Sequence, residues 1–140
     1  MKYLLDTHVA IWALDDKTKL SEKAKAIIDD VSLVLCVSMV SAWEIAIKAS
    51  IDKLDFVGGS ETFLTEMQKN GLELLNLKGP HIKYVENLPF HHRDPFDRLL
   101  ISTALAEKLT IITIDENTMC HGFGKIEFIL GGKVYAAVSC

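Results

Sequence analysis

Short, uninterrupted apolar runs alternate along this chain with longer stretches of helical periodicity, and this alternation constrains the fold more than any other feature. The runs at 2–5, 33–37 and 110–114 are predicted to be strands. They lack the polar–apolar alternation of a strand with one solvated face, so each should be covered on both faces. The helical stretches between them therefore predict a parallel sheet with helices on both sides.

Caps and breakers supply the remaining predicted elements. Ser21 is expected to cap one helix, and Gly58-Gly59-Ser60 to break the chain before another. We predict further strands at 72–77 and 126–130, and helices at 7–14, 21–30, 43–49, 60–70, 80–89 and 95–108. The predicted fold class is α/β, a three-layer α/β/α architecture with a central parallel sheet of about five strands.

The size and charge of the chain narrow the options further. A chain of 140 residues that is 49% hydrophobic is expected to form a single domain over 1–140. Its longest apolar run, 33–40, is too short to span a membrane, and the opening MKYLLDTH leaves no room for a signal peptide. A cytoplasmic location is expected. The net charge of −4 argues against a broad basic face, so any contact with nucleic acid should be local.

Four acidic residues stand where a predicted strand ends or a predicted helix begins: Asp6, Glu44, Asp97 and Asp115. In a parallel α/β sheet these points converge on one edge, where ligands bind. Packed carboxylates repel one another unless a cation lies between them, and oxygen ligands suit Mg²⁺ or Mn²⁺ rather than zinc. The pattern therefore predicts a divalent-metal site suited to phosphate-ester chemistry.

Most of these acids also have a purely structural explanation. Asp6 and Asp115 could each cap the helix that follows a strand. Glu44 stands three residues after Ser41, which is a capping-box spacing, and four before Lys48, which is the spacing of a surface ion pair. Each explanation is complete for its own residue, but none requires the four acids to share one edge.

The run HHRDPFDRLLISTA contains two acids with different expectations. Asp94 precedes a proline and is expected to cap a helix rather than bind metal. Asp97 falls at the third helical position, at the N-terminus of a helix apolar enough to be central. His91 and His92 lie in the polar loop before this helix and are expected to be exposed rather than catalytic.

Three segments of the chain closely resemble PIN-domain proteins, and in particular the VapC toxins of bacterial type II toxin–antitoxin modules. They are LLDTHVAIWAL, VSAWEIAIK and HRDPFDRLLISTALAEKLTIITID, in the expected order. The resemblance covers the chain from Tyr3 to about Asp115. The DPFDR run, followed shortly by a strand that ends in TID, is its most specific part.

The resemblance implies a PIN-like fold and an endoribonuclease that depends on Mg²⁺ or Mn²⁺. It places the family's acidic residues at Asp6, Glu44, Asp97 and Asp115, and a small polar residue near the metal at Thr113. We expect Asp6 and Asp97 to be the main metal ligands, with Glu44 and Asp115 completing the site directly or through water. The resemblance also implies an RNA substrate, a homodimer, and a small cognate antitoxin that inserts a basic residue into the acidic site.

Two other classes of function remain open at this stage. One is a metal-dependent phosphatase or DNA nuclease on the same sheet edge, although the Asp-x-Asp-x-Thr signature of one phosphatase family fails at Asp6-Thr7-His8. The other is an inactive member of the fold that serves as a binding scaffold. A cleavage assay on RNA and DNA, with a metal titration, would separate them.

Overall fold

The computed structural model describes residues 2–88, 94–113, 127–130 and 133–136. Within these residues the chain forms one sheet in the strand order β3-β2-β1-β4-β5-β6. The strands are β1 (Lys2–Leu5), β2 (Val34–Ser38), β3 (Glu73–Leu75), β4 (Thr110–Ile112), β5 (Glu127–Leu130) and β6 (Lys133–Ala136). The first five in the order pair in parallel, which confirms the predicted sheet, and β6 adds an antiparallel edge strand that was not predicted.

The central strands are covered on both faces, as their apolar runs predicted. Alternate residues of a strand point to opposite faces, so each central strand contributes to two hydrophobic cores. One core contains the strand residues Tyr3, Leu5, Leu35, Val37 and Ile112. The other contains Leu4, Cys36 and Ile111.

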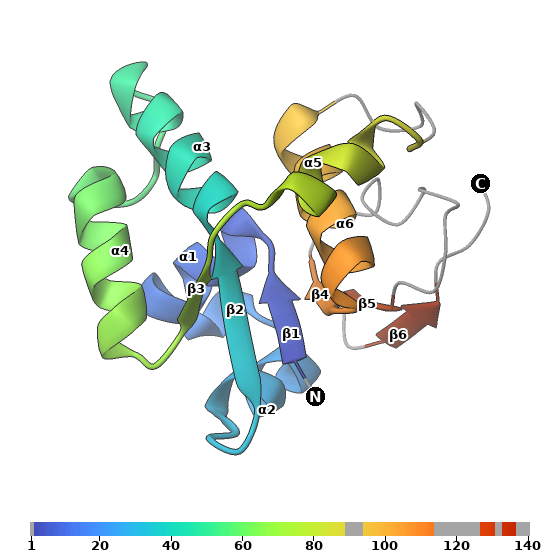
Figure 1. Cartoon of the computed structure of the whole chain (residues 1–140). Helices are drawn as coiled ribbons and strands as arrows, with labels where there is room; N and C mark the ends of the chain where they lie inside the picture. Colours follow the sequence, from blue (N-terminus) through green and yellow to red (C-terminus); the bar gives the residue numbers. More distant parts are fainter. Residues whose placement is uncertain (1, 89–93, 114–126, 131–132, 137–140) are drawn as a thin grey trace.

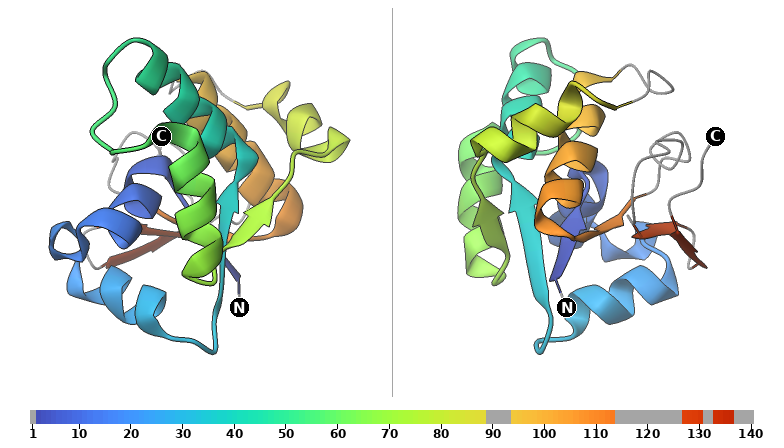
Figure 2. Two further views of the ribbon diagram at one scale, coloured as in Figure 1. Left: turned by 90° about the vertical axis from the view of Figure 1, so that its left-hand side faces the viewer. Right: turned by 45° about the vertical axis from the view of Figure 1, so that its right-hand side comes forward.

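Helices from different parts of the chain cover the two faces. They are α1 (Thr7–Asp15), α2 (Glu22–Asp29), α3 (Met39–Ser50), α4 (Gly59–Lys69), α5 (Gly79–Val85) and α6 (Pro95–Glu107), with a 3-10 turn at Lys17–Lys19. Helices α1, α2 and α4 pack on the first core, whereas α6 packs on the second and α5 lies against α6 (Figures 1 and 2). The result is the predicted three-layer α/β/α architecture.

Local rules explain several helix starts. The Ser21 hydroxyl accepts a hydrogen bond from the Ala24 N–H at 3.1 Å and so caps α2, as predicted. Gly58 precedes α4 with φ +98°, and a Cβ there would lie 2.1 Å from the Thr62 hydroxyl oxygen. Only glycine fits this position without displacing Thr62.

Helix α3 begins four residues earlier than predicted. The Ser38 hydroxyl accepts from the Val40 N–H at 3.1 Å, and Met39 is the first helical residue. Strand β2 therefore passes into α3 without a loop. In the predicted capping box, Ser41 would cap the helix and the Glu44 side chain would bond back to the Ser41 backbone N–H. This prediction is wrong, because Ser38 is the N-cap and Ser41 already lies inside the first turn.

A buried histidine joins α5 to α6. His81 is 1% exposed, and its Nδ1 accepts from the Lys78 N–H at 3.2 Å, so the ring proton lies on Nε2. This Nε2 donates to Glu107 Oε1 at 2.7 Å, and the hydrogen bond lowers the pKa of the Glu107 carboxyl. The pair therefore ties α5 to the last turn of α6.

Cys36 is buried in the second core, as expected for a small hydrophobe, and burial raises the pKa of its thiol. In the described part of the chain, no helix combines the length and apolar character required to cross a bilayer.

The chain path reverses at one point of the sheet. From β1 the chain moves to β2 and β3 on one side, and it returns through α6 to β4 on the other side of β1. The carboxyl ends of β1 and β4 flank this reversal, which is where open α/β sheets bind ligands. Asp6 directly follows β1, and Thr113 directly follows β4.

Candidate functional site

Asp6 is held at the carboxyl end of β1 by two hydrogen bonds. Its Oδ1 accepts from the Val9 N–H at 2.8 Å and so caps α1. Its Oδ2 accepts from the hydroxyl of Thr113. The side chain is only 7% exposed, and the two bonds fix the plane of its carboxylate. The capping explanation for Asp6 is therefore correct, but it uses only one of the two oxygens.

Glu44 lies in the second turn of α3 and faces the start of α1. Its Oε1 accepts from the Thr7 hydroxyl at 2.7 Å, and its Oε2 pairs with Lys48 Nζ at 2.6 Å. The Thr7 hydroxyl also lies 2.9 Å from Ser41 Oγ, and since it donates to Glu44 it must accept from Ser41. The predicted pairing with Lys48 is present, yet Glu44 is only 5% exposed, so this is not a surface ion pair.

The N-terminus of α6 brings a third element to this region. Asp94 caps the helix, with its Oδ1 accepting from the N–H groups of Phe96 at 2.9 Å and Asp97 at 3.4 Å, as predicted. The Phe96 ring packs edge-on against Trp43 of α3, with centroids 5.2 Å apart. Because Trp43 adjoins Glu44, this contact sets the first turn of α6, with the half-buried Asp97, beside the turn of α3 that carries Glu44.

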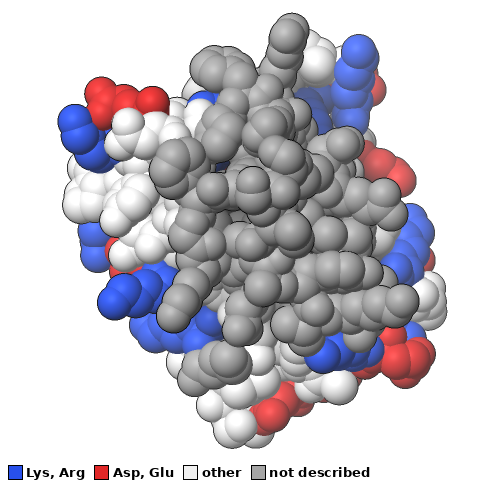
Figure 3. All heavy atoms as spheres, turned by 90° about the vertical axis from the view of Figure 1, so that its right-hand side faces the viewer, with Lys and Arg blue, Asp and Glu red and all other residues white. Residues whose placement is uncertain are grey.

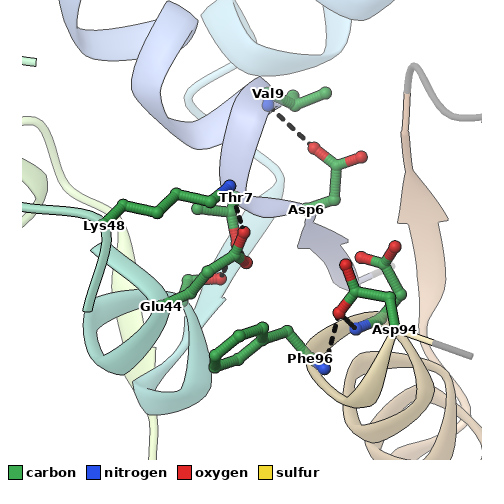
Figure 4. A network of polar contacts seen from close by, with 9 residues as sticks. Asp6, Thr7, Val9, Glu44, Lys48, Asp94 and Phe96 are labelled. Atoms are coloured by element: carbon green, nitrogen blue, oxygen red, sulfur yellow. Dashed lines mark hydrogen bonds and ion pairs between the residues drawn. The ribbon is translucent and has the colours of Figure 1, made fainter. Parts of the chain in front are cut away.

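Figure 4 shows Asp6, Glu44 and Asp94 extending from three different elements into the same region. Thr7 links two of these elements, because it follows Asp6 and donates to Glu44. The contacts thus bring together the end of β1, the second turn of α3 and the start of α6. Asp115, the fourth predicted acid, lies outside the described residues, as do His91 and His92.

The donor atoms at this edge are of the type that binds a hard cation. Carboxylate and hydroxyl oxygens are the ligands that Mg²⁺ and Mn²⁺ prefer. The described residues contribute such oxygens at this edge, from Asp6, Glu44 and Thr113. Within residues 2–88 and 94–113, however, no three acidic, histidine or cysteine side chains lie close enough to enclose an ion by themselves. The described part of the site therefore offers suitable donors but not a complete coordination shell.

Two buried residues were not singled out from the sequence as parts of this site. Thr7 joins α1 to Glu44. The sequence feature that could have pointed to Thr7 is the Asp-Thr pair at the end of the first strand. Arg98 is 6% exposed and donates to the carbonyls of Val85 and Leu88, at 3.3 and 3.2 Å. It fastens the end of α5 to the first turn of α6, next to Asp97. The sequence feature that could have pointed to Arg98 is an arginine within a mostly apolar helix.

Comparison with known families identifies the class of protein. The PIN domain family model matches residues 3–121, which is most of the chain. The chain therefore belongs to the PIN-domain family. A comparison with curated proteins gives no significant match.

Solved structures with a similar fold include three protein complexes. VapBC2 from Rickettsia felis, bound to a promoter DNA fragment, is 16% identical, with a TM-score of 0.57 over 82% of this chain and 89% of that chain. DNA-bound VapBC from Salmonella typhimurium is 17% identical, with a TM-score of 0.57 over 81% and 86%. FitAcB from Neisseria gonorrhoeae is 20% identical, with a TM-score of 0.54 over 84% and 90%. At these identities the similarity establishes a common fold.

Proposed function

We propose that this protein is a toxin-type endoribonuclease that hydrolyses RNA phosphodiester bonds with the help of Mg²⁺ or Mn²⁺. The observation that carries the proposal is the fixed, buried carboxylate of Asp6 at the reversal point of the sheet, with the Glu44 and Asp97 elements packed beside it. Membership of the PIN-domain family supports nuclease chemistry at this edge.

The residues take distinct roles in this proposal. Asp6 and Asp97 would hold the metal, and Glu44 and Asp115 would complete the site directly or through water. A metal bound there would lower the pKa of a coordinated water and stabilise the charge that develops on the phosphate. Thr113 orients the Asp6 carboxylate by donating to Oδ2, while the Val9 N–H in the first turn of α1 holds Oδ1. No side-chain nucleophile is needed, so the products should carry a 5′-phosphate and a 3′-hydroxyl.

The first test is cleavage of a labelled single-stranded RNA, with a DNA of the same sequence in parallel. We expect RNA cleavage to stop when a chelator removes divalent ions and to resume when Mg²⁺ or Mn²⁺ is added, because the acidic residues cannot activate water alone. Mass spectrometry of the products should find 5′-phosphate ends. Cleavage that survives the chelator and leaves 2′,3′-cyclic phosphates would contradict the proposal and direct attention to His91 and His92. Preference for DNA would favour a DNA nuclease.

We further propose that a small antitoxin silences this protein by placing an arginine or lysine against the acidic residues. A guanidinium can pair with a carboxylate through two hydrogen bonds and occupy the place of a cation. VapBC and FitAcB complexes share the fold, and α3 with its C-cap presents an exposed apolar row of Trp43 (56%), Ile47 (37%) and Ile51 (54%) that a wrapping segment could cover. The proposed resting state is a homodimer with antitoxin bound.

Co-expression with a small reading frame found directly beside this gene tests the partner. We expect growth arrest when the protein is expressed alone, because free nuclease would cleave cellular RNA. Co-expression should yield a stable, inactive complex, and replacing the antitoxin's inserted basic residue with alanine should restore part of the cleavage. Light scattering of the purified protein gives its oligomeric state. A protein that purifies alone, as a monomer without effect on growth, would argue strongly against the toxin assignment.

A further inference from the structure

A groove opens beside the acidic residues, on the side of α1 and the segment after α3. Its volume is about 210 Å³, and it is lined by Thr7, His8, Trp12, Lys19, Lys48 and Lys53, among others. Asp55 is the one acidic residue of its lining. A local concentration of three lysines and an imidazole is notable on a chain with a net charge of −4. The described surface visible in Figure 3 carries both basic and acidic side chains.

The groove is continuous with the candidate active site. Lys48 lines the groove and also pairs with Glu44, with 2.6 Å between Nζ and Oε2. Thr7 lines the groove, follows Asp6 and donates to Glu44. Figure 4 shows the end of Lys48 and Thr7 close together beside the Glu44 carboxylate. A polymer with one phosphodiester at the carboxylates would therefore place an adjacent unit in this groove.

The groove combines two aromatic rings with two lysines, Lys19 and Lys53. The His8 and Trp12 rings lie 6.2 Å apart, and Lys19 Nζ lies 5.7 Å from the centre of the Trp12 ring. His8 is exposed and Trp12 half-buried. Among the described residues, no carboxylate oxygen lies within salt-bridge distance of Lys19 or Lys53. Aromatic faces that stack bases, beside lysines that contact phosphates, are how proteins hold single-stranded nucleic acid.

The size of the groove favours one unit of a polymer over a free metabolite. Sites for drug-sized molecules occupy roughly 300–1,000 Å³, and this one is smaller. We propose that it binds a nucleotide adjacent to the scissile bond of a single-stranded RNA. The base stacks on the Trp12 and His8 rings, and Lys19 and Lys53 contact the flanking phosphates. The assignment of RNA rests on the proposed function, but binding in the groove can be measured without cleavage.

The experiment measures binding of a fluorescein-labelled single-stranded RNA of mixed sequence to Asp6→Asn protein, which should not cleave it, in buffer with Mg²⁺. The Lys19→Ala/Lys53→Ala double variant should bind roughly tenfold more weakly at about 0.1 M salt. The slope of log affinity against log salt should fall by about 1.4, or about 0.7 per lost phosphate contact. A Lys23→Ala/Lys69→Ala variant removes the same charge from α2 and α4 and should bind within about twofold of the parent.

Trp12 provides a second readout. The chain has two tryptophans, so a Trp43→Phe background leaves Trp12 as the only one. Its fluorescence should be quenched when RNA binds, and Trp12→Leu should weaken binding by about 5- to 150-fold, as expected for loss of base stacking. Should Trp12→Leu fail to fold, as judged by circular dichroism, the lysine variants and the quenching still decide the question.

The outcomes distinguish this inference from the proposed function. Unchanged affinity and salt slope in the Lys19→Ala/Lys53→Ala variant, with no quenching of Trp12, would overturn the groove assignment even if the protein cleaves RNA. Binding through the groove without any cleavage would uphold the inference and refute the nuclease. An acidic peptide that binds the groove while RNA does not would also overturn the inference.

Discussion

Replacing either Asp6 or Asp97 with asparagine is expected to slow RNA cleavage by at least about 100-fold while leaving the fold intact. In the proposed site each carboxylate supplies a ligand charge, and metal assistance contributes several kcal/mol to the transition state. Asparagine has nearly the same volume and remains a good helix cap, so Oδ1 of residue 6 can still accept from the Val9 N–H. The Thr113 hydroxyl can then reverse its role and accept from the new amide. Single-turnover cleavage rates, with melting temperatures alongside, make the measurement.

The matched control for Asp97 is Asp94→Asn. It removes the same charge from the same helix terminus, three residues earlier, and leaves a side chain that can cap α6 as Asp94 does. Cleavage should stay within about twofold of the parent. An equal loss in Asp94→Asn and Asp97→Asn would mean that the terminus acts through its general negative charge rather than through Asp97. Normal cleavage by Asp6→Asn would refute the site as proposed.

Phe63→Ala is expected to give the largest loss of stability, about 3–5 kcal/mol. The Phe63 side chain is fully buried in the core beneath α1 and α4, and its ring meets that of Phe56 edge-on at 6.1 Å. Removing it leaves a cavity that rigid neighbours on the sheet cannot fill. Because domains of this kind are stable by only about 5–15 kcal/mol, the midpoint of urea unfolding should fall markedly.

Val57→Ala is the control for this prediction. Val57 is 93% exposed and lies one residue from Phe56, so its truncation should change stability by less than about 0.5 kcal/mol. If Phe63→Ala cost less than about 1 kcal/mol, the packing of α4 against the sheet would be looser than described.

Local rules identified the helix caps from sequence. Ser21 and Asp94 cap the helices they were predicted to cap, because each contact spans only two or three residues. The start of α3 was misjudged because the apolar run 33–40 contains all of β2 and the first two residues of α3, and periodicity cannot divide so short a run. Strand β6 was missed although the sequence places Gly131-Gly132 between two short β-prone runs, a hairpin signal.

For the site, too, local sequence patterns predicted some features and missed those that depend on tertiary packing. The sequence predicted that Asp6, Glu44 and Asp97 would converge, because strand ends and helix starts share one edge of a parallel sheet. It could not predict the partner of each oxygen. The Thr7–Glu44 contact spans 37 residues and depends on how α1 packs against α3, which no local pattern encodes. The place of Asp115 and the metal-binding role of all four acids remain predictions.

The hydrogen bond between Thr113 and Asp6 joins residues 107 positions apart. A ribosome adds roughly 5–20 residues per second, so about 5–20 s pass between synthesis of the two partners. During that interval β1 has no β4 beside it, α6 has not yet folded onto the sheet, and the carboxylate of Asp6 lacks its second support. A nascent chain therefore lacks the assembled acidic edge, and any activity that depends on it, until nearly all of these elements have left the ribosome.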